Sequence, residues 1–127
     1  GYTIGLSSAV DGGSTQVVCN DRMDEESLEV CDVLDNSLIF NGDDALVLVC
    51  GSVGTTEFRR HVDRIGQVGM DPGSSWGNGG LSTKNATLRR DCDVEMGDGE
   101  INEVFTPSDE FTSEAIDVFD GLGEHCE

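Results

Sequence analysis

The sequence predicts an all-β fold, a β-sandwich with one short helix. Short runs of β-branched and aromatic residues recur along the chain, with turn residues between them. Gly is frequent, at 17 of 127 residues, and only one segment carries the N-caps and acidic first turn of a helix. Because this length suits one domain with one modest core, we expect a single domain over residues 1–127.

The first third of the chain predicts two strands and the helix. Apolar and polar residues alternate over residues 1–10, which predicts a strand, and a shorter strand follows at 15–19 after a Gly-rich turn. The helix begins at an N-capping residue in 20–24 and ends near 32–35 after two or three turns. Glu25 and the acidic residues after it lie where the helix dipole favours them.

The clearest predicted element is a β-hairpin. An Asn-Gly dipeptide favours a type I′ turn, which would join residues 38–40 to the apolar run 45–50. Two aspartates follow the turn. We expect them to stabilise the turn and to face solvent, and cation binding is the weaker interpretation. The four residues of this motif are Asn41, Gly42, Asp43 and Asp44.

The second half of the chain predicts three further strands. Residues 61–68 predict a strand with a bulge at Arg64, and residues 87–92 predict another. Residues 115–119 are expected to form a last strand or a single helical turn. The Gly-rich stretch 70–82 is expected to be loop.

Tryptophan and arginine stand out because they are rare here. We expect Trp76, the only tryptophan, to fold back and cover one end of the sandwich; the alternative is an exposed residue that stacks on a carbohydrate. Arg89 and Arg90 are neighbours on a predicted strand, so they point to opposite faces. We expect one to hold an acidic loop by a forked pair of hydrogen bonds and the other to reach solvent, with a nucleic-acid contact as the weaker alternative.

The five cysteines predict disulfides, because no C-x-x-C pair typical of zinc or redox sites occurs. We expect bridges that join Cys19 to Cys31 and Cys50 to Cys92, each contributing about 3–4 kcal/mol to stability. Cys126 is then unpaired or bonded to another chain. Such cysteine usage is typical of secreted, extracellular proteins.

The net charge of −19 argues against nucleic acid as a partner of this chain alone, because a phosphate backbone would be repelled. No apolar run approaches the length of about 20 residues that a membrane-spanning helix needs. A solvated acidic surface, loose uptake of divalent cations and adaptation to high salt are the three interpretations of this charge.

No motif identifies a catalytic group, and we predict that the protein is not an enzyme. His61 and His125 stand in no context that names a nucleophile, and no G-x-S-x-G elbow occurs. No cofactor is predicted. Calcium is the alternative at a loose cluster of carboxylates, although the flanking ligands of an EF-hand loop are missing. The cluster consists of Asp91, Asp93, Glu95 and Asp98.

The segment Asn85-Ala86-Thr87 is an N-glycosylation sequon. It makes Asn85 a candidate glycan site if the protein is secreted by a eukaryotic cell. The same residues lead into a predicted strand, so structure alone also explains them. The sequence leaves both interpretations open.

The run from Phe40 to Arg90 reads FNGDDALVLVCG and then DRIGQVGMDPGSSWGNGGLSTKNATLRR. It resembles the second half of the lamin tail domain found in secreted microbial and algal proteins. Residues 1–4 and 105–111 are similar to further parts of that family, which forms an immunoglobulin-like β-sandwich. The resemblance also implies strands before Gly1 that this chain lacks, so a longer precursor or another chain would complete the sheet.

These observations predict a non-catalytic extracellular module for structure, assembly or adhesion, such as a subunit of a secreted filament or surface layer completed by strand addition. A protein partner or a second copy would supply the missing strand. The alternatives are an accessory domain of a larger secreted nuclease and a calcium- or carbohydrate-binding module.

Overall fold

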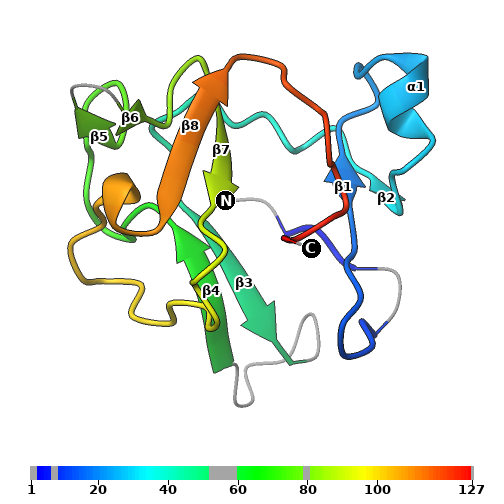
Figure 1. Ribbon diagram of the computed structural model, residues 1–127. Coiled ribbons are helices and arrows are strands. Elements are labelled where there is room, and N and C mark those ends of the chain that lie inside the picture. The colour runs from blue at the N-terminus through cyan, green and yellow to red at the C-terminus, as the bar shows by residue number, and fades with distance from the viewer. Residues whose placement is uncertain (1–2, 7–8, 52–59, 79–80, 127) are drawn as a thin grey trace. The chain divides into compact units, whose positions relative to one another are not determined.

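The computed structural model describes residues 3–6, 9–51, 60–78 and 81–126. Short strands dominate it, together with a single-turn α-helix and one 3₁₀ turn, so the fold is all-β as predicted (Figure 1). The elements in chain order are β1 (Val18–Cys19), α1 (Glu25–Leu28), β2 (Val33–Leu34), β3 (Leu46–Cys50), β4 (Arg60–Ile65), β5 (Gly77–Asn78), β6 (Leu81–Ser82), β7 (Ala86–Arg90), η1 (Pro107–Asp109) and β8 (Phe111–Ala115).

The strands in the described ranges form four separate two-stranded sheets. β1 and β2 are parallel, whereas β3–β4, β5–β6 and β7–β8 are antiparallel. Because none of these sheets has a third strand, the immunoglobulin-like sandwich stays a prediction.

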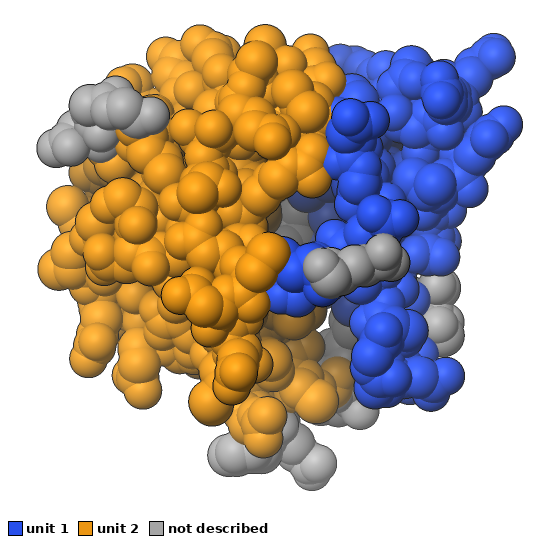
Figure 2. All heavy atoms as spheres, in the orientation of Figure 1, with its two compact units in different colours: residues 1–39, 119–127 blue, residues 40–118 orange. Residues whose placement is uncertain are grey.

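The chain divides into two compact units, which Figure 2 shows in different colours. The smaller unit comprises residues 1–39 and 119–127, and the larger unit comprises residues 40–118. Each unit has buried apolar residues of its own.

A disulfide between Cys19 and Cys31 holds the smaller unit together, as predicted. Cys19 is only 1% exposed, so the bridge lies in the core of this unit. The Asp32 carboxylate accepts a hydrogen bond from the Val17 N–H at 2.7 Å, and the Asp32 N–H donates to the Val17 carbonyl at 2.8 Å. The bridge and these bonds close the loop that contains α1.

α1 has one turn instead of the two or three predicted. The Asp24 carboxylate caps it by accepting a hydrogen bond from the Ser27 N–H at 3.3 Å, and hydrogen bonding with Ser27 lowers the pKa of Asp24. Glu25 and Glu26 occupy the first turn, where the dipole favours them. No residue of α1 is buried and its last turn has no basic residue, so neither packing nor charge extends it.

The hairpin predicted across the Asn-Gly turn is wrong. Residues 38–40 form no strand, and β3 pairs with β4 instead. The Gly42 carbonyl accepts hydrogen bonds from the Thr83 hydroxyl and from the Trp76 N–H. The turn therefore docks on the segment from Trp76 to Thr83 and does not return the chain along residues 38–40.

Three of the other predicted strands are confirmed. β1 lies within the strand predicted at 15–19. β4 begins one residue before the predicted strand region 61–68 and otherwise lies within it. β7 begins one residue before the strand predicted at 87–92 and ends two residues earlier. β4 ends at Ile65 because Gly66 adopts a φ of 87° against the Trp76 indole, where a Cβ would lie 2.8 Å from Nε1.

Three other predictions differ from the structure. The last strand is β8, which ends where the predicted strand at 115–119 would begin. Of the predicted first strand, residues 3–6 and 9–10 form no strand, and residues 1–2 and 7–8 lie outside the described residues. The stretch 70–82, of which residues 79 and 80 also lie outside, carries the short strands β5 and β6 rather than loop alone.

Candidate functional site

The strongest candidate site is the free edge of β3. This strand has the sequence Leu-Val-Leu-Val-Cys, without a charged residue, and it pairs with β4 along one edge. No other strand within the described part of the chain pairs with it. Leu46, Leu48 and Val49 are 39%, 47% and 39% exposed, and Cys50 is exposed with a free thiol. Unpaired backbone groups beside exposed apolar side chains suit this edge for accepting another strand.

The β3–β4 ribbon contains a bulge on β4. Val62 is the extra residue, because successive positions of β3 face Asp63 and then His61. The sequence predicts this bulge at Arg64, which is a nearby but wrong position. A bulge raises the local twist of a ribbon, and bulges are common at sheet edges.

The opposite edge of the ribbon, along β4, is covered by the loop that follows β7. The two backbones approach so closely that a Cβ on Gly97 would lie 2.3 Å from the Val62 carbonyl oxygen. A Cβ on Gly99 would lie 2.5 Å from the His61 carbonyl oxygen. Only glycine fits at such distances, and the loop leaves this edge no room for another strand.

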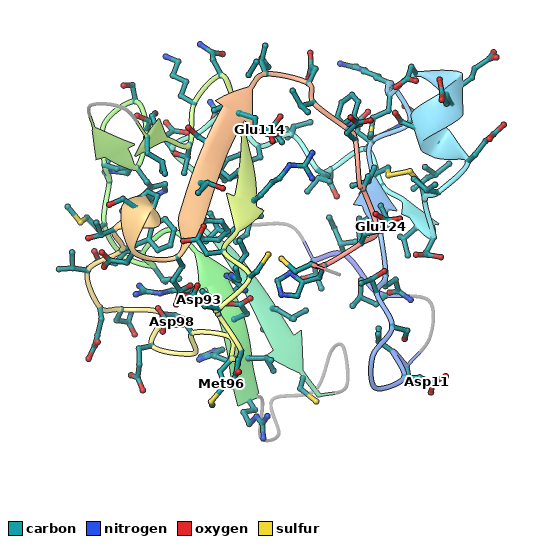
Figure 3. All side chains as sticks on the ribbon, in the orientation of Figure 1. Asp11, Asp93, Met96, Asp98, Glu114 and Glu124 are labelled. Atoms are coloured by element: carbon teal, nitrogen blue, oxygen red, sulfur yellow. A yellow bond between two sulfur atoms is a disulfide. The ribbon has the colours of Figure 1, made fainter. Side chains whose placement is uncertain are left out.

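Buried Arg64 holds the covering loop in place. This side chain on β4 is 6% exposed, and its Nε donates to the Asp98 carboxylate at 2.8 Å. Figure 3 labels Asp98 on the loop after β7. The terminal nitrogens of Arg64 donate to the carbonyls of Glu103 and Val104. One guanidinium therefore satisfies three acceptors of the loop.

Arg90 makes a forked pair of hydrogen bonds, as expected for one residue of the Arg pair, although the acceptor is on a strand and not on a loop. Its two terminal nitrogens donate to the two carboxylate oxygens of Asp63, and its guanidinium lies 4.9 Å from the centroid of the Phe111 ring. Arg89 forms an ion pair with Glu114 on β8 at 2.9 Å, at a more exposed position (Figure 3).

The Asp63 carboxylate accepts hydrogen bonds from the Arg90 guanidinium, from the Arg64 backbone N–H and from the Asp98 backbone N–H in the loop. Burial raises the pKa of its carboxyl, but hydrogen bonds from Arg90 and from the backbone N–H groups of Asp98 and Arg64, together with the charge of Arg90, outweigh burial. The pKa of Asp63 therefore lies below its ordinary value. The backbone bond from Asp98 is 3.0 Å long and ties the loop directly to β4.

Trp76 is 4% exposed, which agrees with the predicted packing role and not with a ligand-stacking one. Its indole N–H donates to the Asp44 carbonyl at 2.8 Å. Its ring meets Phe105 edge-on, with centroids 6.1 Å apart. These contacts leave no open ring face on Trp76 for a sugar.

An open hollow of about 330 Å³ lies beside Trp76. Its described lining carries no charged side chain. Gln67 forms part of it, with Nε2 donating to the Asn102 carbonyl at 3.0 Å and Oε1 buried without a hydrogen-bond partner. Because no described lining residue is an acid or a base, the hollow has no group for acid–base catalysis. Its other polar lining residues are Ser75, Thr106 and Ser108.

The carboxylate cluster considered for calcium forms no such site. Figure 3 labels Asp93 and Asp98 on the same loop, but no group of three or more His, Cys, Asp or Glu residues in the described ranges could hold a metal ion. Asp98 is engaged by Arg64 instead. At the other candidate position, the Asp44 carboxylate accepts the Asn41 N–H at 3.1 Å, which is its expected turn-forming role. The cluster without a metal site is Asp91, Asp93, Glu95 and Asp98.

The cysteine pairing differs from the prediction in part. Cys50 is free, so the predicted bridge from Cys50 to Cys92 is wrong. Cys92 and Cys126 are both disulfide-bonded, so the prediction of an unpaired Cys126 is wrong as well. The physical reason is the strand pairing: β3, which ends at Cys50, lies along β4 and not along β7.

His61 and His125 are both exposed. Neither imidazole has a hydrogen bond to another described residue, so no pair of nucleophile and base is assembled on either side chain.

The sequence patterns do not predict that Arg64, Asp63 and Gly97 hold the covering loop against β4. The sequence does contain one indication of this role for Arg64. Arginine is rare here, and Arg64 falls within a predicted strand, where a charged side chain that turns inward needs buried partners.

No protein-family model, no curated protein and no solved structure matches this chain. No helix among the described residues is long and apolar enough to cross a membrane. Any assignment of function therefore depends on the geometry of the chain itself.

Proposed function

We propose that this chain is a non-catalytic extracellular assembly module whose β3 edge accepts a strand from a second copy of the chain. One observation carries the proposal: β3 is an uncharged, apolar strand that is paired on one side only within the described residues. The resemblance to the lamin tail family remains a prediction beside it.

The contrast between the two ribbon edges supports strand addition. An open strand edge is a site for unwanted pairing, and proteins usually protect such edges with charges, proline or a covering loop. This chain covers β4 with a glycine-containing loop, whereas β3 has no charged residue and no proline, and no described strand other than β4 pairs with it. An apolar strand left open in so acidic a chain is best explained as an interface.

The composition of β3 favours a second copy as the partner. In an antiparallel pair related by a two-fold axis at Leu48, Leu48 would face its own counterpart and Val47 would face Val49. Such an interface is closed and self-complementary, as in most homodimers. No like charges would face each other across the pair, which removes a common cost of strand pairing.

The net charge of −19 per chain opposes the association of two copies. Salt reduces this repulsion, because the screening length falls from about 10 Å at 0.1 M to about 3 Å at 1 M. We therefore expect the dimer to become more stable as the salt concentration rises.

The extracellular location rests on the cysteines. Four of the five are disulfide-bonded, and such bonds persist in oxidising compartments. The nuclease-accessory alternative has no structural observation in its favour. The calcium- and carbohydrate-binding alternatives lose the residues on which they depended, because the described carboxylates form no metal group and Trp76 is buried.

Sedimentation velocity over a concentration series, at low and high salt, tests the proposal. The chain should carry Cys50→Ser, so that a chance disulfide between copies cannot imitate strand pairing. Leu48→Lys should weaken the dimer by about tenfold or more, which corresponds to about 1.4 kcal/mol.

Met96→Lys is the matched control, because it adds the same charge at a residue that is 81% exposed on the loop after β7 (Figure 3). It should leave the dimer unchanged. A chain that stays monomeric under all these conditions, or equal weakening by both lysines, would contradict strand addition at β3.

A further inference from the structure

Asn85 differs in the way its side chain is used from the other asparagines whose side chains the structure describes. The amide of Asn20 donates to the Leu38 carbonyl at 3.2 Å, and the amide of Asn102 donates to the Val68 carbonyl at 3.2 Å. The amide of Asn36 is likewise engaged and donates to the Asp21 carboxylate at 2.9 Å. The Asn85 side chain makes no hydrogen bond with any other described residue.

The backbone also presents Asn85 outward. The residue is exposed in the turn between β6 and β7, and its φ is 54°. Asparagine tolerates this left-handed conformation better than most residues, which explains its presence in the turn. Its amide nitrogen can therefore carry a large substituent without the loss of any contact of the fold.

The only N-x-Ser/Thr sequence of the chain falls on this free asparagine, with Thr87 two residues later. The Thr87 hydroxyl oxygen accepts a hydrogen bond from the Val118 N–H at 3.1 Å. The turn explains why an asparagine stands at position 85, but it does not require that the asparagine amide be left unengaged. We propose that Asn85 is a site of N-linked glycosylation.

The reaction requires a lipid-linked oligosaccharide as the sugar donor. The Asn85 amide nitrogen forms a bond to C1 of the first sugar and loses one proton. The bond between that sugar and the lipid pyrophosphate breaks, and the lipid pyrophosphate leaves with the electron pair. No oxidation or reduction takes place.

The turn before Asn85 lies against Gly42, where a Cβ would be 2.9 Å from the Lys84 Cα. The inference does not depend on dimerisation, and its test is independent of it.

The test is the intact mass of the full chain secreted from a eukaryotic cell, before and after treatment with a peptide N-glycosidase. The wild type should lose the mass of one N-glycan, and position 85 should become Asp. Asn85→Gln should abolish the shift, whereas Thr87→Ser, which keeps the hydroxyl, should retain it. Asn102→Gln is the matched control and should also retain the glycan.

Two results would overturn the inference: a secreted wild type without a glycan, or a glycan that persists in Asn85→Gln. The disulfide content of each secreted variant, read from mass under non-reducing conditions, shows whether a loss of glycan reflects a misfolded chain. If Asn85→Gln does not reach the medium, Asn85→Asp tests the same point with a side chain of the same shape.

Discussion

The two edges of the β3–β4 ribbon differ in protection, although they belong to one short element. Along β4, a loop with two close-packed glycines covers the backbone, and a guanidinium that is 6% exposed holds the loop. Along β3, no strand is added within the described residues, and Leu48 is 47% exposed. Protection of a strand edge in this fold therefore depends on particular residues, here Arg64 and the two glycines of the loop, and none of the described strands gives β3 a second partner.

The largest effect is expected from removing the guanidinium that holds the loop. Arg64→Met would leave the Asp98 carboxylate and two carbonyls without their donors. Chemical denaturation should show a loss of about 3–4 kcal/mol in the free energy of unfolding. Arg60→Met, at an exposed position on the same strand, should change it by no more than about 0.5 kcal/mol. Equal losses would mean that the loop is not held by Arg64.

A smaller loss in the free energy of unfolding is expected from a substitution that displaces the loop from β4. In Gly97→Ala the added methyl would meet the Val62 carbonyl oxygen, so the loop must move at a cost of about 2 kcal/mol. Hydrogen exchange of the β4 amides should become faster. Gly5→Ala has nothing within 4 Å of its new methyl and should have little effect. Unchanged exchange on β4 in Gly97→Ala would show that the loop does not protect this edge.

The stability that Asp63 contributes at the covered edge should depend on pH. Its folded pKa is lowered, so its stabilising effect is complete above the unfolded value of about 3.9 and is lost as the pH falls through the folded pKa. The difference in unfolding free energy between the wild type and Asp63→Asn should be constant near neutral pH and should shrink below about pH 4. Asp93→Asn, a change at an exposed residue, serves as the control. A difference that does not vary with pH would contradict a charged Asp63 at this edge.

The smallest effect on folding is expected at the open edge. Leu48 is already half exposed, so Leu48→Lys should change the free energy of unfolding of the monomer by only about 0.5 kcal/mol. Thermal denaturation at a concentration below that of dimer formation measures this change. A loss of several kcal/mol would show that β3 is part of the core and not an open edge.

Local features of this fold could be predicted from the sequence. The capped start of α1, the burial of Trp76, the forked contact of Arg90 and the bridge from Cys19 to Cys31 follow from side-chain chemistry over short distances. Each requires only that particular residue types stand in a particular order.

Pairings across the chain could not be predicted in the same way. The Asn-Gly turn predicted a hairpin with residues 38–40, but the Gly42 carbonyl bonds to residues more than 30 positions away. That contact frees β3 to pair with β4 and leaves Cys50 as a free thiol. The close approach of Gly97 to β4 has no local signature, because it depends on where two distant segments meet.

Hydrogen exchange of the chain as a function of its concentration tests the central claim most directly. If β3 accepts a strand from a second copy, the amides of β3 should exchange more slowly as the concentration rises, while those of β4, already covered, should not change. Exchange of β3 that is independent of concentration, at concentrations where sedimentation detects dimers, would place the interface elsewhere and contradict the account.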